Sequence, residues 1–407
     1  MVQGNGRSLH VLLVSHRFAS DAAGGTEVLT KDLAAALVTR GHEVSWLAVG
    51  DPPSEEPPSP WAHLPLPATF DPGYPARWRE QEERQASFAQ ERLAARPPVD
   101  IVHVTHFSRV GLALLERPPL AGVPVVATLT DYTVVCPDYQ LLLRGTGKHC
   151  EATAPSSRCL RCLGLPEAWE REIASWRARN RDWLNRRVRA FWTQTPHQAR
   201  ELGRGGISMR RLVRDTACYA VPQKWASLQT SPAEPGYVLF LGRCSPEKGL
   251  HVLLDAFLAW PGDLRLVLAT LPDDQTYESQ LRARTKHDPR IEWVTGLPRT
   301  DIGRLLAGSR AIVVPSQWYE NHPLVAREAW ALGVPVYCSA VPSMAHLAGA
   351  PGMHLVARYE NPGSWVAVLD AIRNGSCRGE ARVEHCLREF DEFVDEIVDI
   401  YLAQVTT

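Results

Sequence analysis

Short apolar segments, each followed by a loop and then a helical pattern, constrain the fold of this chain most. Residues 9–15 read LHVLLVS and residues 237–243 read YVLFLGR. Runs of this length without polar alternation are typical of strands that are buried on both faces of a parallel sheet. Similar runs alternate with helical spacing at residues 42–49, 101–106, 123–131, 189–195, 264–270, 290–296, 311–316 and 334–339. This alternation predicts an α/β fold built on parallel sheets.

The strand–helix pattern occurs twice, which predicts two doubly wound, Rossmann-like domains. A length of 407 residues is also sufficient for two complete cores. The connecting segment, residues 217–235, is rich in Pro, Ser and Gln. We therefore predict an N-terminal domain over residues 1–216, a C-terminal domain over residues 236–381, and a helical segment over residues 382–407. Residues 51–67 carry seven prolines and are expected to form an exposed loop.

The overall charge argues against several classes of partner. The chain has 44 Lys and Arg residues against 45 Asp and Glu residues, a formal charge of −1. That balance provides no general attraction to nucleic acid or to an anionic membrane. The first apolar run is too short for a signal-peptide core, and no run approaches the ~18 residues of a membrane span. These features predict a soluble, cytoplasmic protein.

The segment GRCSPEKG, residues 242–249, follows a buried strand and precedes a helix. A glycine turn in that position directs backbone N–H groups and a helix N-terminus toward an anion. Arg243 and Lys248 add two cations suited to phosphate oxygens. The spacing differs from that of a P-loop, and a surface turn with solvated charges is the alternative.

The segment ENHPLVARE, residues 320–328, carries two glutamates around a predicted helix start. Pro323 suits the first turn of a helix, and the N–H groups near Leu324 and Val325 would be free to bind a phosphate. The carboxylates of Glu320 and Glu328 suit sugar or ribose hydroxyls. Stabilisation of the helix dipole by two acidic residues is the alternative. In the N-terminal half, Gly24 and Gly25 permit a close backbone approach to a ligand, although a plain tight turn fits as well.

Together, GGTE at residues 24–27, GRCSPEKG at residues 242–249 and PSQWYENHPLVAREAWALGVPV at residues 315–336 resemble the GT-B glycosyltransferases. More specifically, they resemble glycosyltransferase family 4, whose members retain the anomeric configuration. The resemblance covers nearly the whole chain and implies two Rossmann-like domains that face each other across a cleft.

The resemblance also implies roles for individual residues. Arg243 and Lys248 would bind the diphosphate of a nucleotide-sugar donor, Glu328 the ribose, and Glu320 would face the donor sugar near the reacting carbon. Gly24 and Gly25 would line the cleft. The sugar and the β-phosphate would be contacted by the backbone of Asn321, His322, Pro323, Leu324 and Val325.

One position departs from the family pattern. Relatives commonly read TLHD where this chain reads Thr128-Leu129-Thr130-Asp131, so Thr130 replaces the family histidine. Asp131 remains, and His106, at the end of the preceding strand, is the histidine expected to reach the cleft. His103 alternates with strand residues and is expected to be packed. The change at Thr130 leaves the donor sugar and the details of transfer open.

Four cysteines, Cys136, Cys150, Cys159 and Cys162, form a C-x13-C-x8-C-x2-C pattern, and the CxxC pair is a common zinc half-site. They predict a structural Zn²⁺, with His149 as an alternative ligand; free thiols or a labile disulfide are the alternatives. Catalysis itself is expected to need no cofactor or metal.

Trp169, Trp176 and Trp183 recur every seven residues on an arginine-rich helix predicted over residues 169–192. The favoured interpretation is a helix that buries its aromatic stripe in the N-terminal domain while its arginines reach outward to solvent. The alternative is an amphipathic surface that meets a lipid-linked acceptor or an anionic membrane.

The sequence therefore predicts a retaining glycosyltransferase that uses a nucleoside-diphosphate sugar and a sugar-containing or lipid-linked acceptor, and binds no nucleic acid. The alternatives are another GT-B enzyme, such as a nucleotide-sugar epimerase or a sugar phosphorylase, and a catalytically weak binding or scaffold protein. A phosphorylase would carry a pyridoxal-binding lysine, and no candidate is visible.

Overall fold

The computed structural model describes residues 7–19, 24–52, 59–67, 78–215, 236–271, 273–321, 323–375 and 389–406. The chain divides into two compact units. Unit 1 comprises Met1–Ala217 together with Asp391–Thr407, and unit 2 comprises Cys218–Phe390. In the described residues, no helix is both long and apolar enough to cross a membrane.

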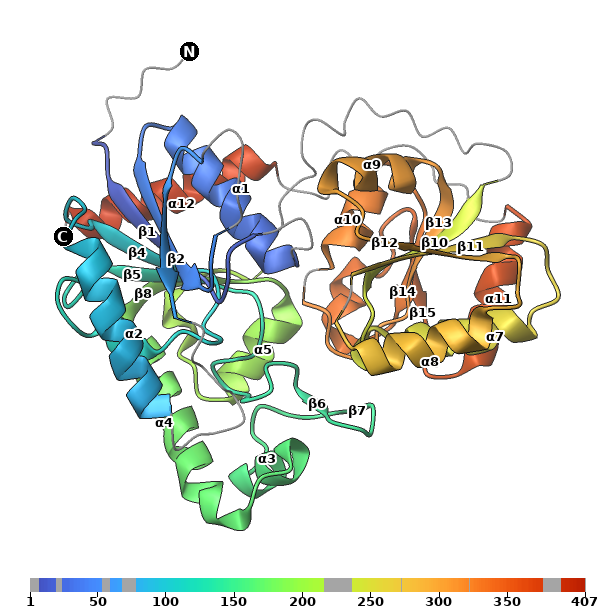
Figure 1. Ribbon diagram of the computed structural model, residues 1–407, viewed down its shortest axis with the longest axis horizontal. Helices are drawn as coiled ribbons and strands as arrows, with labels where there is room; N and C mark the ends of the chain where they lie inside the picture. Colours follow the sequence, from blue (N-terminus) through green and yellow to red (C-terminus); the bar gives the residue numbers. More distant parts are fainter. Residues whose placement is uncertain are drawn as a thin grey trace. The chain divides into compact units, whose positions relative to one another are not determined.

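Unit 1 is built on a parallel sheet in the order β3-β2-β1-β4-β5-β8-β9 (Figure 1). Its strands are β1 (His10–Val14), β2 (Glu43–Val49), β3 (Ala62–Leu66), β4 (Ile101–Val104), β5 (Val125–Leu129), β8 (Val188–Thr193) and β9 (Leu212–Arg214). Its helices are α1 (Gly25–Thr39), α2 (Trp78–Leu93), α3 (Ser156–Leu163), α4 (Glu170–Arg187), α5 (Pro196–Arg204) and α12 (Phe390–Val405). A two-stranded ribbon of β6 (Leu142–Leu143) and β7 (Lys148–His149) precedes α3.

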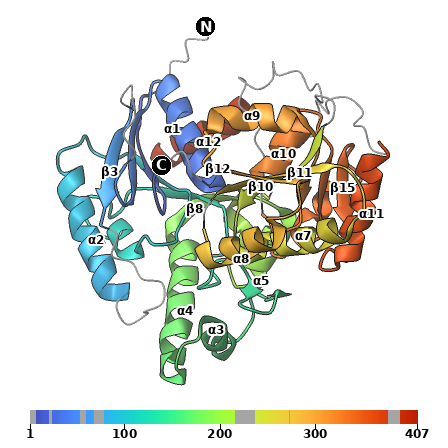
Figure 2. The same cartoon turned by 45° about the vertical axis from the view of Figure 1, so that its right-hand side comes forward.

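Unit 2 has a second parallel sheet in the order β12-β11-β10-β13-β14-β15 (Figure 2). Its strands are β10 (Tyr237–Arg243), β11 (Arg265–Leu271), β12 (Ile291–Thr295), β13 (Ser309–Val314), β14 (Val336–Ser339) and β15 (Met353–Val356). The helices are α7 (Leu250–Ala259), α8 (Gln275–Thr285), α9 (Arg299–Ala307), α10 (Leu324–Ala331) and α11 (Pro362–Arg373). The strands predicted from the apolar runs are confirmed in both units. Most of them are inner strands of these sheets, whereas the run at residues 290–296 forms β12, a partly exposed edge strand.

The expectation that residues 51–67 form only an exposed loop is wrong. Residues 62–66 form β3, which lies at the edge of the first sheet and pairs with β2. Pro65 is tolerated there because an edge strand leaves one row of N–H groups unused, so a missing donor costs no ladder bond. The proline count excluded a central strand but not an edge strand.

Helix α12 brings the end of the chain back to unit 1, where it lies among the blue and cyan elements of Figure 1. Tyr401 of α12 is fully buried, and its hydroxyl lies 2.5 Å from Nδ1 of His103 in β4. The other ring nitrogen of His103 lies 2.9 Å from Oγ1 of Thr128 in β5. His103 is thus packed, as predicted, and it ties α12 to two strands of the sheet.

Candidate active site

In unit 2, the predicted donor residues follow β10 and β13, two neighbouring strands from which the sheet order runs in opposite directions. Residues 244–249 connect β10 to α7, and residues 315–323 connect β13 to α10. In doubly wound sheets, ligands bind at this switch point, at the carboxyl ends of the strands. The topology therefore places both motifs where a ligand site is expected.

Gly249 allows the two loops to touch. Its φ of +70° lies in the left-handed region, and a Cβ there would come within 1.9 Å of the Pro315 carbonyl oxygen. The Gln317 N–H donates to the Glu247 carbonyl over 2.8 Å and joins the loops a second time. Only glycine accommodates both the backbone conformation and this close approach.

This contact brings together Lys248 and Glu320, which the sequence analysis took from two separate motifs. Lys248 Nζ lies 2.6 Å from Glu320 Oε1, and Ser316 donates a hydrogen bond to the same oxygen. Burial alone would raise the pKa of Glu320, but the charge and hydrogen bond of Lys248, with the Ser316 bond, hold this pKa below its usual value. Glu320 is therefore an ionised carboxylate in a buried position.

Arg243 is also held by carboxylates. Its guanidinium donates to Glu247 over 2.8 Å and to Asp273 over 2.5 Å. Both cations that the sequence assigns to a diphosphate thus have their positions fixed by acidic neighbours.

The other residues that the sequence predicts to bind the sugar donor lie just before α10 or within it. Pro323 precedes the helix, Leu324 is its first residue and Val325 its second. Asn321 and Glu328 are buried, with 3% and 5% of their surface exposed. His322 lies outside the described residues.

In unit 1, a second group of polar residues occupies the corresponding switch point. Strands β1 and β4 are neighbours from which the sheet order diverges, and β5 follows β4. His16, His106 and Asp131 each lie two residues beyond the end of β1, β4 and β5. The parallel arrangement therefore gathers these three side chains at one edge of the sheet.

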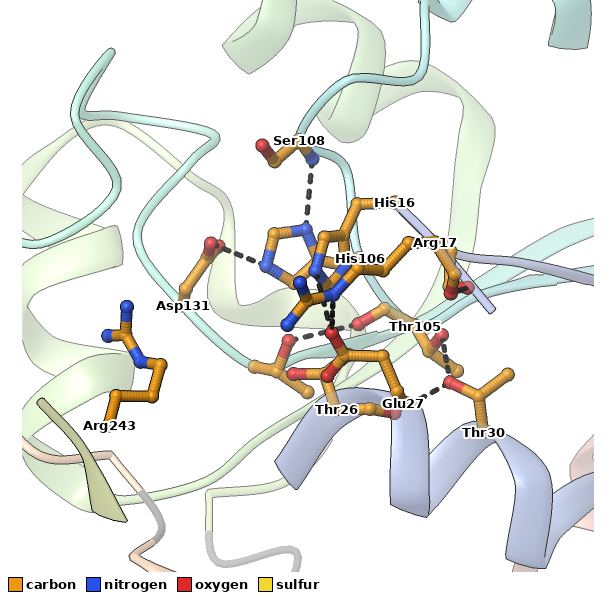
Figure 3. A network of polar contacts seen from close by, with 12 residues as sticks. His16, Arg17, Thr26, Glu27, Thr30, Thr105, His106, Ser108, Asp131 and Arg243 are labelled. Atoms are coloured by element: carbon orange, nitrogen blue, oxygen red, sulfur yellow. Dashed lines mark hydrogen bonds and ion pairs between the residues drawn. The ribbon is translucent and has the colours of Figure 1, made fainter. Parts of the chain in front are cut away.

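Two imidazole–carboxylate pairs lie side by side at this edge (Figure 3). His106 Nε2 lies 2.8 Å from Asp131 Oδ2, and His16 Nε2 lies 3.1 Å from Glu27 Oε1 in α1. The two ring centroids are 4.2 Å apart. Arg17 donates to the same Glu27 oxygen from the other side. We call these four residues, His16, Glu27, His106 and Asp131, the paired-histidine cluster.

Hydrogen bonds define the protonation of His106. The Ser108 N–H donates to Nδ1 over 3.0 Å, so Nδ1 carries a lone pair and Nε2 carries the proton that faces Asp131. Asp131 also accepts hydrogen bonds from the backbone and the hydroxyl of Thr133. Burial would raise the pKa of Asp131, but His106 and Thr133 lower it overall. The Nε2 atom of His106 thus faces an ionised carboxylate.

In the His16–Glu27 pair, the pKa values of both side chains are lowered. Burial, together with the neighbouring His106, lowers the pKa of His16 to about 4, although Glu27 opposes this shift. Burial would raise the pKa of Glu27, but hydrogen bonds and charge from His16 and Arg17 lower it far below its usual value. At neutral pH the pair is a neutral imidazole bound to a carboxylate.

His16, Arg17 and the role of Glu27 were missed by sequence reasoning, which used only the glycines of this loop. Gly24 is the N-cap of α1 and Gly25 its first residue; a Cβ on Gly24 would lie 2.9 Å from Glu27 Oε2. The available signal was the pair of polar residues directly after a buried strand, in the loop that ends at these glycines.

Thr130 does not take the place of the family histidine chemically. Its hydroxyl donates to the Thr105 carbonyl over 3.0 Å and so joins the ends of β4 and β5. The imidazole that contacts Asp131 is that of His106, two residues beyond the end of the neighbouring strand β4.

The cysteine pattern folds into the segment around β6, β7 and α3. Cys159 interacts electrostatically with Cys136, Cys150 and Cys162, so the structure brings all four into one neighbourhood. Burial raises the pKa of Cys136, Cys159 and Cys162, and all four are free thiols. Within the described residues, however, no three or more His, Cys, Asp or Glu side chains are arranged to hold a metal ion. Zinc stays a prediction.

The arginines of α4 bind other parts of unit 1. Arg179 pairs with Glu82 of α2, Arg177 donates to the Ala152 and Ala154 carbonyls, and Arg187 donates to the Leu115 carbonyl. Trp183 is fully buried, whereas Trp169 and Trp176 are half-buried and pack against Leu160 and Ile173. The predicted buried aromatic stripe is therefore confirmed only in part.

Two parallel-sheet units, each with a polar site at its switch point, define a two-domain Rossmann-like architecture of the GT-B kind. Residues 24–214 match the glycosyl transferase 4-like domain, and residues 223–376 match the glycosyl transferases group 1 family. The chain belongs to this family of glycosyltransferases, and the resemblance noted from its motifs is confirmed.

Known relatives agree with this assignment. The O-antigen chain mannosyltransferase B of Escherichia coli is 33% identical over 143 residues, which cover 33% of this chain and 35% of that protein. The match thus spans about a third of the relative. Sucrose-phosphate synthase from Thermosynechococcus elongatus has the same fold, with a TM-score of 0.71, 18% identity, and coverage of 98% of this chain and 100% of that one. HepE from Anabaena, in complex with UDP and glucose, superposes with a TM-score of 0.66 at 15% identity over 96% of this chain and 99% of that one.

Proposed function

We propose that this protein is a retaining glycosyltransferase that transfers a sugar from a nucleoside-diphosphate donor to a hydroxyl of a sugar-containing or lipid-linked acceptor. The observation that carries the proposal is the contact between Lys248 and Glu320 at the switch point of unit 2. A cation for the leaving diphosphate and a carboxylate for sugar hydroxyls lie side by side there. The solved structure of HepE is a complex with UDP and glucose, which supports a donor of this class.

The chemistry follows from charge. Departure of a nucleoside diphosphate builds negative charge on the β-phosphate, and Arg243, Lys248 and the N-terminus of α10 offer compensating positive charge. Glu320 would hold a hydroxyl of the donor sugar, and Glu328 the ribose. In this proposal the acceptor proton passes to the departing phosphate, which gives front-face attack and retention of configuration. No metal or cofactor is part of the step.

Unit 1 would bind the acceptor. The ionised carboxylates of Asp131 and Glu27 accept hydrogen bonds from the two imidazoles and fix their orientation. We propose that the protein works in the cytoplasm, with peripheral contact with the inner membrane face where the acceptor is lipid-linked.

The test is donor turnover. The protein is incubated with UDP-glucose, UDP-galactose, UDP-N-acetylglucosamine and GDP-mannose, and release of free nucleotide is measured with and without alkyl glycoside acceptors. Glu320→Gln and Lys248→Met should each lower turnover by about 100-fold or more, as expected for groups that stabilise the transition state. The control, Glu292→Gln, alters an exposed carboxylate in β12 and should leave turnover unchanged.

NMR of the product identifies the anomer and therefore tests retention. Interconversion of the donor sugar without an acceptor would instead indicate an epimerase. Nucleotide binding without any turnover would indicate a binding or scaffold protein. Either result contradicts the proposed transfer.

A further inference from the structure

A pocket in unit 1 adjoins the paired-histidine cluster but shares no residue with it. Its walls come from α2, α4 and the segments that follow β4 and β5. Helix α4 presents Trp176, Asn180 and Trp183, spaced at i, i+4 and i+7, so that one helix face lines the pocket. Two of these are the tryptophans whose seven-residue spacing stood out in the sequence.

The pocket is directly connected to the cluster. Ser108, which lines the pocket, donates its N–H to His106. Thr133, which also lines it, donates two hydrogen bonds to Asp131. A molecule in the pocket therefore lies next to the residues that hold the His106–Asp131 pair.

Buried polar contacts fix the walls. The fully buried side chain of Gln85 donates to the Arg109 carbonyl and accepts from the Gly111 N–H, each over 2.9 Å. A Cβ on Gly111 would lie 2.2 Å from Glu82 Cγ, so glycine is required for α2 to approach this closely. Glu82 in turn pairs with Arg179 of α4. Helices α2 and α4 are thus joined across the pocket, which gives it a defined shape.

The lining combines two kinds of surface. Phe107, Trp176 and Trp183 contribute aromatic rings, while Asn180 and Thr133 contribute polar groups. The indole N–H of Trp183 is buried and has no hydrogen-bond acceptor among the described residues. A buried donor without an acceptor is unfavourable, and an oxygen that a ligand brings to this N–H would satisfy it.

We propose that this pocket binds a pyranose unit of the acceptor. The inference rests on the proposed glycosyl transfer and names the part of the acceptor that unit 1 recognises. A pyranose ring has an apolar C–H face for aromatic side chains and hydroxyls for the amide, the threonine hydroxyl and the indole N–H. An alkyl chain would fill the same volume but leave the indole N–H of Trp183 without an acceptor.

The test measures sugar binding directly, so that it does not depend on turnover. Saturation-transfer difference NMR is recorded on the full chain with methyl α-glucopyranoside, methyl α-mannopyranoside and methyl α-galactopyranoside, and with 1-octanol as an apolar probe. We expect at least one pyranoside to bind. Asn180→Leu and Trp183→Phe should each weaken that binding about fivefold or more, and Ser175→Ala, an exposed position on the same helix, should not.

Binding of UDP and GDP, measured by calorimetry, should be the same in all variants. The inference is overturned if no pyranoside binds, if only 1-octanol binds, or if neither pocket variant weakens sugar binding while UDP or GDP binding is retained. Far-UV circular dichroism shows whether each variant is folded. If one of the two pocket variants does not fold, the other still tests the inference. Absence of donor binding and turnover in the unsubstituted protein would contradict the proposed function. Sugar binding is measured independently, so failure of the proposed function and failure of the pocket assignment can be distinguished.

Discussion

The Lys248–Glu320 pair gives a prediction about stability that is independent of any substrate. Lys248→Met removes the ammonium but keeps the side-chain stem, and it leaves Glu320 with only 4% of its surface exposed and no cation. Removal of one partner from a buried ion pair typically costs about 3 kcal/mol, because the other charge stays desolvated. Glu320→Gln should cost about 1 kcal/mol, since Lys248 keeps 19% of its side chain in contact with solvent.

The stability cost of Lys248→Met should depend on pH, and the shift in the pKa of Glu320 sets the direction. In the native protein the pKa of Glu320 lies below its unfolded value, so the pair contributes stability above the unfolded pKa and loses it as pH falls through the folded pKa. Without Lys248, burial is the dominant influence and reverses the shift. The cost of Lys248→Met should therefore be largest near pH 8 and fall as the pH is lowered toward 5, where Glu320 can be protonated.

Urea unfolding followed by circular dichroism at pH 8 and pH 5 measures this cost. A double-mutant cycle with Glu320→Gln should recover about 2 kcal/mol of the summed effects at pH 8. Equal costs of Lys248→Met at both pH values, or purely additive effects, would refute the conclusion that Lys248 compensates a buried charge. Loss of nucleotide binding in Lys248→Met without loss of stability would show a cation that serves the ligand alone.

Three further predictions concern unit 1. Tyr401→Phe should lower the unfolding free energy by about 1–2 kcal/mol, because it leaves Nδ1 of the buried His103 unpaired; unchanged urea unfolding would contradict this. Because the pKa of His16 is lowered to about 4, its neutral form stabilises the fold at neutral pH, and this stability is lost as pH falls from about 6.5 toward 4. The slope should be smaller in His16→Gln, and an identical slope in both proteins would count against the assignment. Protein purified from zinc-supplemented medium should contain about one zinc per chain by elemental analysis, and Cys159→Ser combined with Cys162→Ser should remove it; metal-free wild-type protein would show that the cysteines remain thiols.

Most strands could be predicted from the sequence, because a strand that is buried on both faces consists of nearly continuous apolar residues. The runs that became β1, β5, β10 and β13 are continuous and apolar, whereas Pro65 in β3 could be judged only with a sheet edge in view. Likewise, the motifs identified Arg243, Lys248 and Glu320 singly. That Lys248 contacts Glu320 depends on a loop contact at Gly249, which joins segments about seventy residues apart and has no local sequence signature.

The paired-histidine cluster likewise depends on contacts between residues from different strands, which the sequence alone did not reveal. It also bears on the threonine at position 130. Relatives commonly carry a histidine one residue before Asp131, and the sequence alone left the consequence of Thr130 at that position open. In the fold, however, Asp131 faces His106, which reaches it from the neighbouring strand, while the Thr130 hydroxyl bonds the backbone between the two strands. The His106–Asp131 pair is made by residues that follow two adjacent parallel strands, β4 and β5, and it is present with threonine at position 130. An intact imidazole–carboxylate pair at the switch point favours an enzyme over a degenerate binding protein.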